Sequence, residues 1–157
     1  MQRLPLLQLD FIEAFKRICP QEWRIDAETS LHIPNLDVDR ITKIFDAFVV
    51  DIKTSSPEIY TQYTGGTLGI PMTHLKHLLA AAGSDRVIVR VPLIPDYTTV
   101  HQQQETIEFL HSLGVTQIDT FRYLRPQGTS PETSLNRAKI ISAIKSWPST
   151  PKPSMAK

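Results

Sequence analysis

The spacing of apolar residues changes several times along the chain, and each change predicts a new element. Apolar residues recur every three or four positions over residues 9–18, which predicts a helix that Pro20 ends. Side chains able to cap a first turn precede five further apolar patterns. The predicted helices that follow them cover residues 37–45, 57–63, 74–82, 99–113 and 131–147.

Four short segments alternate with these helices and are predicted to be strands, over residues 23–28, 47–53, 86–92 and 116–121. The segments over 47–53 and 86–92 are rich in Val and Ile and too short for helices, which is typical of buried strands. Alternation of this kind favours an α/β fold with about four parallel strands, joined by right-handed crossovers. Such a sheet could be a complete doubly wound domain or a partial (β/α) barrel. Periodicity alone leaves both open.

The predicted domain covers residues 1–147. Residues 148–157 contain three prolines and are predicted to form a disordered tail. With 41% apolar and 21% charged residues in 157, the composition is that of one soluble domain. A net charge of +1 argues against a nucleic-acid partner.

No apolar stretch approaches the roughly 20 residues of a membrane helix, and no secretory signal is visible. Cys19 is the single cysteine, which excludes an internal disulfide and any metal site made of several cysteines. A cytoplasmic location is therefore expected, with neither membrane nor nucleic acid as a partner.

Charged residues follow the predicted buried strands at the edge where ligands bind in such sheets. Asp51 and Lys53 end one strand, Arg90 lies within the next, and Glu28 ends the first. Two interpretations stay open. These groups either contact a ligand or pair with one another, since an arginine in an apolar run is costly unless it is paired.

Three further features also have a purely structural interpretation. Thr29 and Ser30 could present hydroxyls to a ligand, or they could form a turn. His74 and His77 have helical spacing but no evident third metal ligand. The glycines at 65, 66 and 69 lack the Lys-Ser/Thr ending of a phosphate loop.

Four segments together resemble the later part of a radical S-adenosylmethionine (SAM) enzyme. The similarity is to the branch that activates glycyl radical enzymes, typified by pyruvate formate-lyase activating enzyme. It covers about residues 4–128. The segments occur in the family's order: 4–8 with Phe11, the acidic-Thr-Ser motif 28–30, the strand end 49–53 with 63–65, and the Arg-to-Pro segment 89–98.

The resemblance implies an incomplete (β/α)₆ barrel and the binding of SAM beside a [4Fe-4S] cluster. The family's partner is a glycyl radical enzyme, on which the activating enzyme installs the radical. Carried over residue by residue, it implies a cofactor-binding set consisting of Glu28, Thr29, Ser30, Asp51, Lys53 and Arg90. Lys53 would reach the SAM carboxylate as a point charge.

The chain departs from the family at several positions. The loop with three cysteines is absent, so no cluster is expected on this chain. Gln2, Arg3 and Leu4 occupy the place of a Gly-Gly-Glu motif. Asp96 replaces a glycine, and Leu124 stands where a histidine is usual. SAM binding is therefore expected to be weak or lost, and the chain alone to be catalytically inactive.

Other functions remain open on the residues alone. Lys53 could form a Schiff base in an aldolase-like lyase, although the nearby Asp51 favours its charged form. A non-catalytic binding module is a further alternative. A barrel that lacks its first strand exposes a strand edge, so self-association is also expected.

Overall fold

The computed structural model describes residues 5–123. The predicted helix over 131–147, the predicted tail over 148–157 and the sequence departures at Gln2, Arg3, Leu4 and Leu124 lie outside the described residues. In chain order the elements are η1 (Pro5–Leu7), α1 (Leu9–Ile18), β1 (Asp26–Thr29), α2 (Val38–Ile44), β2 (Ala47–Asp51), α3 (Pro57–Thr64), α4 (Gly69–Ala82), η2 (Ser84–Arg86), β3 (Val87–Leu93), α5 (Val100–Ser112) and β4 (Gln117–Arg122).

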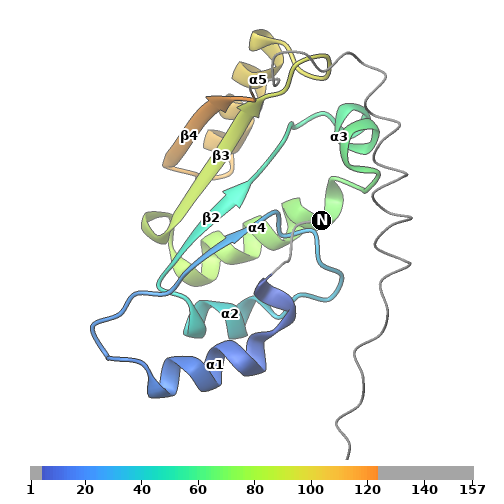
Figure 1. Cartoon of the computed structure of the whole chain (residues 1–157). Helices are drawn as coiled ribbons and strands as arrows, with labels where there is room; N and C mark the ends of the chain where they lie inside the picture. The colour runs from blue at the N-terminus through green and yellow to red at the C-terminus, as the bar shows by residue number, and fades with distance from the viewer. Residues whose placement is uncertain (1–4, 124–157) are drawn as a thin grey trace, which may run out of the picture. The chain divides into compact units, whose positions relative to one another are not determined.

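The four strands form one parallel sheet in the order β1-β2-β3-β4 (Figure 1). A doubly wound sheet reverses its strand order at a switch point, whereas a barrel adds strands in one direction. Within residues 5–123 the order never reverses. The structure therefore confirms the α/β prediction of four parallel strands with flanking helices, and it favours the partial barrel.

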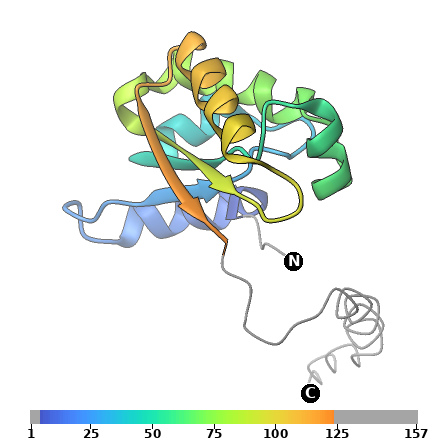
Figure 2. The same cartoon turned by 90° about the horizontal axis from the view of Figure 1, so that it is seen from above.

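The two faces of the sheet differ in burial. Alternate residues of the strands face α2, α4 and α5, and they form the core with Ile41, Leu75 and Leu110. The buried strand residues are Ala27, Phe48, Val50, Val87, Val89 and Val91. Figure 2 shows α4 and α5 on the same side of the sheet. The opposite face, called here the open face, carries half-buried and charged residues.

Local signals in the sequence explain most helix boundaries. The side chain of Asp37 accepts a hydrogen bond of 2.9 Å from the amide of Arg40 at the start of α2. Thr99 and Gln102 form a capping box at the start of α5. The predicted start of a helix after Thr73 is wrong. α4 begins at Gly69, because Pro71 fits a first turn, where its missing N–H is not needed.

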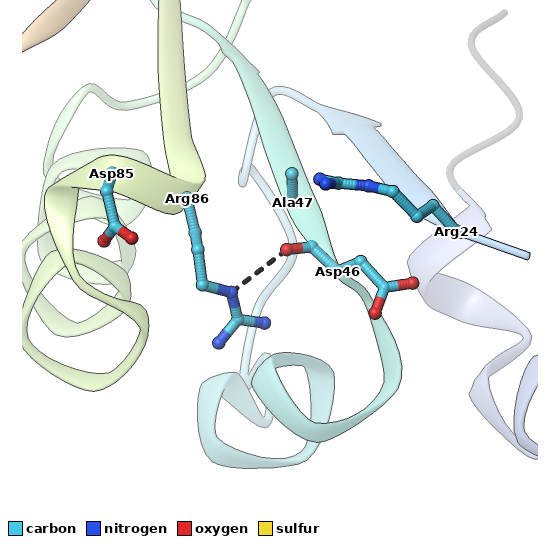
Figure 3. A pocket seen from close by; sticks show the side chains of 5 residues that line it. All are labelled: Arg24, Asp46, Ala47, Asp85 and Arg86. Carbon is cyan, nitrogen blue, oxygen red and sulfur yellow. Dashed lines mark hydrogen bonds between the residues drawn. The ribbon is translucent and has the colours of Figure 1, made fainter. Parts of the chain in front are cut away.

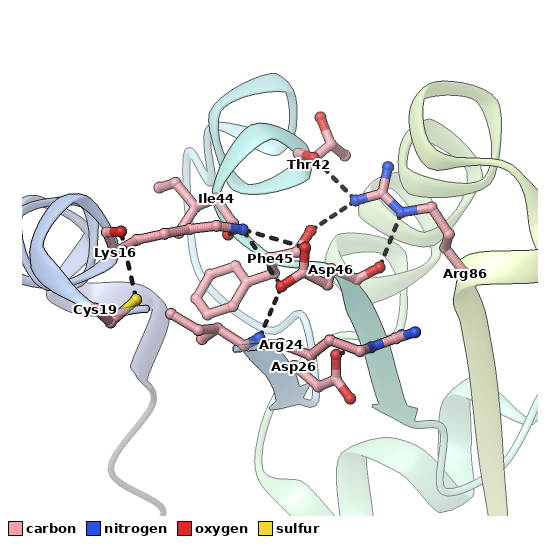
Figure 4. Close-up of polar contacts among 10 residues, drawn as sticks. Lys16, Cys19, Arg24, Asp26, Thr42, Ile44, Phe45, Asp46 and Arg86 are labelled. Atoms are coloured by element: carbon pink, nitrogen blue, oxygen red, sulfur yellow. Dashed lines mark hydrogen bonds and ion pairs between the residues drawn. The ribbon is translucent and has the colours of Figure 1, made fainter. Parts of the chain in front are cut away.

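The C-terminal end of α2 is capped from a distant part of the chain by Arg86. Its guanidinium donates hydrogen bonds to the carbonyl oxygens of Thr42 (3.0 Å), Phe45 (2.6 Å) and Asp46 (3.0 Å), as Figure 4 shows. The last carbonyls of a helix have no partner within the helix. Arg86 therefore satisfies them and ties the start of β3 to α2.

Asp46 joins three elements at the same end of the sheet (Figure 4). Its carboxylate accepts a hydrogen bond of 2.7 Å from the amide of Ile25 and one of 3.2 Å from the ammonium of Lys16 on α1. The amide of Ile25 lowers the pKa of Asp46, and Lys16 adds to this effect against the opposing effect of partial burial. Asp46 thus connects α1, the approach to β1 and the start of β2.

No helix within residues 5–123 is both long enough and apolar enough to cross a bilayer.

Replacing Arg86 with Met should lower the free energy of unfolding by about 1–3 kcal/mol, because three partly buried carbonyls lose their donor. Urea unfolding of both proteins measures the difference. Arg24→Met is the matched control, since Arg24 is exposed and 3.9 Å from its nearest carboxylate partner, Asp26. It should change stability by less than about 0.5 kcal/mol. Equal losses in the two variants would contradict this role.

The contribution of Asp46 should depend on pH. Its folded-state pKa is lowered, so the carboxylate stabilises the fold above the ordinary aspartate value of 3.8. That stabilisation is lost as the pH falls through the lower folded-state pKa. Unfolding free energies of the wild type and Asp46→Asn should therefore differ at neutral pH and converge in acid. A difference that stays constant down to the acid limit would contradict the assignment.

Candidate functional site

Four charged side chains from neighbouring strand ends meet on the open face. Arg90 on β3 lies between Glu28 on β1 and Asp51 on β2. It donates to Glu28, and its Nε donates to Asp51 Oδ1 at 2.8 Å. Lys53, just beyond β2, donates to Asp51 Oδ2 at 3.0 Å. This group of Glu28, Asp51, Lys53 and Arg90 is called here the strand-end cluster.

Asp51 is the centre of the strand-end cluster. It is 5% exposed, and its two carboxylate oxygens accept from two different cations. A buried carboxylate without partners is costly, so these hydrogen bonds explain why an aspartate can end a buried strand. Glu28, by contrast, has a side chain that is 63% exposed. The cluster is therefore anchored at Asp51 and open at Glu28.

The electrostatics keep both cations charged. Burial lowers the pKa of Lys53, but hydrogen bonds to Tyr123 and Asp51 outweigh it and leave that pKa above its ordinary value. Burial also lowers the pKa of Arg90, but the hydrogen bonds to Glu28 and Asp51 outweigh it and leave that pKa above its ordinary value. A Schiff base needs a neutral amine, so the raised pKa of Lys53 works against the lyase alternative.

Two aromatic residues border the cluster, one in β4 and one directly after it, and sequence reasoning missed both. Tyr123 accepts a hydrogen bond of 3.0 Å from Lys53, and the guanidinium of Arg90 lies 5.9 Å from the ring centre of Phe121. The two rings meet edge to face at 5.2 Å. Phe121 shares the open face because strand residues alternate, which is the signal that could have found it.

Thr29 and Ser30 directly follow Glu28 but do not belong to the strand-end cluster. Thr29 is buried on the core side, and its hydroxyl accepts a hydrogen bond of 2.9 Å from the amide of Leu31. This is the turn role that the sequence left open. Leu31 has a φ of 55° and is buried, and a branched residue with positive φ is uncommon. The backbone directly after β1 is therefore held in a strained turn.

Asp96 also has a positive φ, at 69°. It occupies the position where the family resemblance predicts a glycine. The left-handed conformation explains that preference, since glycine adopts it without steric cost. Aspartate is among the residues that tolerate it best, so the turn after β3 keeps its shape despite the substitution.

A close approach of backbone and side chain fixes the loop beyond β1. A Cβ atom on Gly66 would lie 2.1 Å from Cε1 of His32, so no larger residue fits there without a shift. His32 stacks on Tyr60 of α3, and the His32 Nδ1 and Tyr60 hydroxyl oxygen are 2.9 Å apart. Gly66 thus serves loop packing, which agrees with the view that these glycines are not a phosphate loop.

Cys19 lies far from the strand-end cluster along the sheet. It follows α1, at the end of the sheet where the strands begin, and its sulfur donates to the carbonyl of Lys16 at 3.4 Å. No group of three or more His, Cys, Asp or Glu suited to a metal ion occurs within residues 5–123. One cysteine cannot supply the ligands of a [4Fe-4S] cluster, so the residues of this chain do not fit that group.

A hollow of about 340 Å³ also lies at the end where the strands begin, away from the cluster. Figure 3 shows its lining residues Arg24, Asp46, Ala47, Asp85 and Arg86. Arg86 caps α2, and Asp46 joins α1 to the sheet. These two polar residues of the hollow therefore have structural partners, which agrees with the stabilising role that this end of a barrel usually has.

Two curated proteins are similar in sequence to this chain. The indoleacetate decarboxylase activating enzyme of Tractidigestivibacter scatoligenes is 27% identical over 95 residues, which is 60% of this chain and 30% of the relative. The (2S)-3-sulfopropanediol dehydratase activating enzyme of Klebsiella oxytoca is 32% identical over 94 residues, which is 59% of this chain and 29% of the relative. The match thus spans less than a third of either relative.

The fold is similar to that of a solved domain of pyruvate-formate lyase-activating enzyme from Bacteroides vulgatus. The TM-score is 0.61 at 20% identity, and the match covers 90% of this chain and 89% of that domain. No family model matches the chain. The chain is thus similar in sequence to part of two glycyl-radical activating enzymes, and in fold to a domain of a third.

Replacing Asp51 with Asn should lower the free energy of unfolding by about 1–3 kcal/mol, because Lys53 and Arg90 lose the charge that separates them. Glu28→Gln is the matched control on the exposed side of the same arginine. It should cost at most about 1 kcal/mol, as exposed pairs do. Urea unfolding of the three proteins checks the order. A larger loss for Glu28→Gln would contradict the central role of Asp51.

Proposed function

We propose that the strand-end cluster binds the amino-acid end of SAM and that the chain acts as part of a glycyl-radical activating enzyme. The observation that carries the proposal is the convergence of Glu28, Asp51, Lys53 and Arg90 on one open face at the strand ends. Ligands bind at this edge in barrels. The curated relatives are activating enzymes, which supports the same partner class here.

The charges of the cluster suit a ligand that carries both signs. The carboxylate of an amino acid would replace Glu28 on Arg90, since Glu28 is the exposed partner and is the easier of the two to displace. The ammonium group of the ligand would then pair with the released Glu28. Lys53 adds a second positive charge, while Asp51 remains the buried anchor. Phe121 and Tyr123 border this position with apolar ring surface.

Thr29 has a structural role in this proposal, because its hydroxyl accepts from the amide of Leu31 and so holds the turn that contains Ser30. If bound, SAM would supply the radical chemistry of an activating enzyme, for which a [4Fe-4S] cluster would be the reductant. This chain provides no cysteine set for that cluster. The radical chemistry therefore needs a cluster held outside this chain, and the chain alone is inactive towards the glycyl radical enzyme. We also propose that this chain is located in the cytoplasm.

Titration calorimetry with SAM tests the proposed site. We expect saturable binding, weak because the cluster iron that would chelate the ligand is absent. Arg90→Met should weaken it about tenfold or more, since a charge-assisted hydrogen bond is lost. Lys76→Met removes an exposed lysine of α4 and should leave the affinity unchanged. Absence of binding at near-millimolar SAM, or equal effects of the two substitutions, would contradict the proposed site.

A further inference from the structure

Helix α1 presents an apolar stripe to the outside. None of its residues is buried. Phe11 is 68% exposed and Ile18 is 82% exposed, and Ala14 and Phe15 lie along the same side of the helix. This set of Phe11, Ala14, Phe15 and Ile18 is called here the α1 stripe. Contiguous exposed apolar surface of several hundred square ångströms usually marks an interaction site.

The orientation of α1 is fixed by the polar side of the helix. Glu13 accepts two hydrogen bonds from Arg40 of α2, at 2.9 and 3.1 Å. Lys16 donates to the carbonyl of Ile44 at 2.6 Å and to Asp46. Turning the helix to bury the stripe would break all of these contacts. These contacts therefore hold α1 in an orientation in which the stripe faces outward.

The spacing within the stripe is that of a helix pair. Within α1, Phe11, Ala14 and Ile18 follow one another at intervals of three and four residues. This is the repeat with which two helices pack along a shared seam. Alanine in the middle of the seam lets two helix backbones come close. A second helix is thus the element that this surface fits.

The charges beside the stripe indicate that the second helix is another copy of α1. Asp10 lies four residues before Ala14, and Arg17 lies three residues after it. Asp10 contacts Arg40 of its own chain, but its side chain is 94% exposed and so can also face a second cation. When two copies of α1 pack antiparallel about Ala14, Arg17 of one copy approaches Asp10 of the other, twice across the two-fold axis. We propose that the chain forms a two-fold symmetric dimer in which the α1 stripes of two copies pack antiparallel. The proposal is independent of the SAM site.

The edge of β1 is a poorer surface for the same purpose. Both registers that pair three residues of β1 with an antiparallel copy place carboxylates opposite each other. One sets Asp26 against Glu28, and the other sets Glu28 against itself. Like charges directly opposite destabilise a strand pair. The predicted association through a strand edge is thus less favourable than association through α1.

Analytical ultracentrifugation of the full chain tests the proposal over micromolar to near-millimolar concentrations. The stripe is smaller than the interface of a tight complex, so we expect a dimer that dissociates on dilution. Phe11→Glu should raise the dissociation constant about a hundredfold or abolish dimers, because it places two charges in the seam. Val100→Glu is the matched control, since Val100 is equally exposed, at 69%, on α5. It should leave dimerisation unchanged.

Cross-linking tests the antiparallel arrangement separately. Ala14→Cys in a Cys19→Ser background should form a disulfide-linked dimer on mild oxidation, because the two-fold axis brings this position next to its copy. Lys76→Cys in the same background is the exposed control and should cross-link at least about tenfold more slowly.

A chain that stays monomeric at every concentration overturns the proposal and leaves the stripe to a helix of another protein. A dimer that survives Phe11→Glu, or equal cross-linking at positions 14 and 76, overturns the α1 interface. Circular dichroism and the unfolding midpoint of Phe11→Glu should match the wild type, because Phe11 makes little contact within its own fold.

Discussion

The carboxylate of Asp51 sits almost fully buried at the end of a buried strand, and it accepts hydrogen bonds from Lys53 and Arg90. Neither the carboxylate of Asp51 nor the guanidinium of Arg90 would be stable here without a partner of opposite charge. The buried aspartate needs cations, and an arginine within the apolar run of β3 needs carboxylates. The parallel register places Asp51 beside Arg90, so each becomes a partner of the other. Glu28 and Lys53 then complete a cluster that is neutral as a whole.

The one-directional strand order has a consequence for function. Helices cover one face of the sheet and leave the other open, and the strand-end cluster lies on that open face. The opposite end of the sheet is occupied by the Arg86 and Asp46 contacts that hold α1, α2 and β3 together. Stability and candidate chemistry are therefore separated to opposite ends of the strands, as they are in barrel enzymes.

Much of this arrangement is local and could be predicted from the sequence. Apolar runs predicted β2 and β3, and capping residues such as Asp37 and Thr99 predicted helix starts. The meeting of Glu28, Asp51 and Arg90 could be predicted because parallel strands end at the same edge. The start of α4 was missed because Thr73 is a good capping residue, whereas Pro71 fits a first turn equally well.

What the sequence could not provide depends on pairings between distant segments. Arg86 caps a helix that lies over 40 residues earlier, and no local pattern signals such a contact. Tyr123 follows β4 and reaches Lys53, which follows β2, across the one strand between them, so its part in the site follows only from the sheet order. The outward face of α1 was also hidden, because a helical period indicates an apolar face without saying what that face contacts.

A double-mutant cycle between Asp51 and Arg90 tests the central claim most directly. Unfolding free energies of the wild type, Asp51→Asn, Arg90→Met and the double variant give the coupling energy between the two side chains. The account predicts a favourable coupling of about 1 kcal/mol or more, because each charge depends on the other. A coupling near zero would show that the buried carboxylate does not hold the strand ends together.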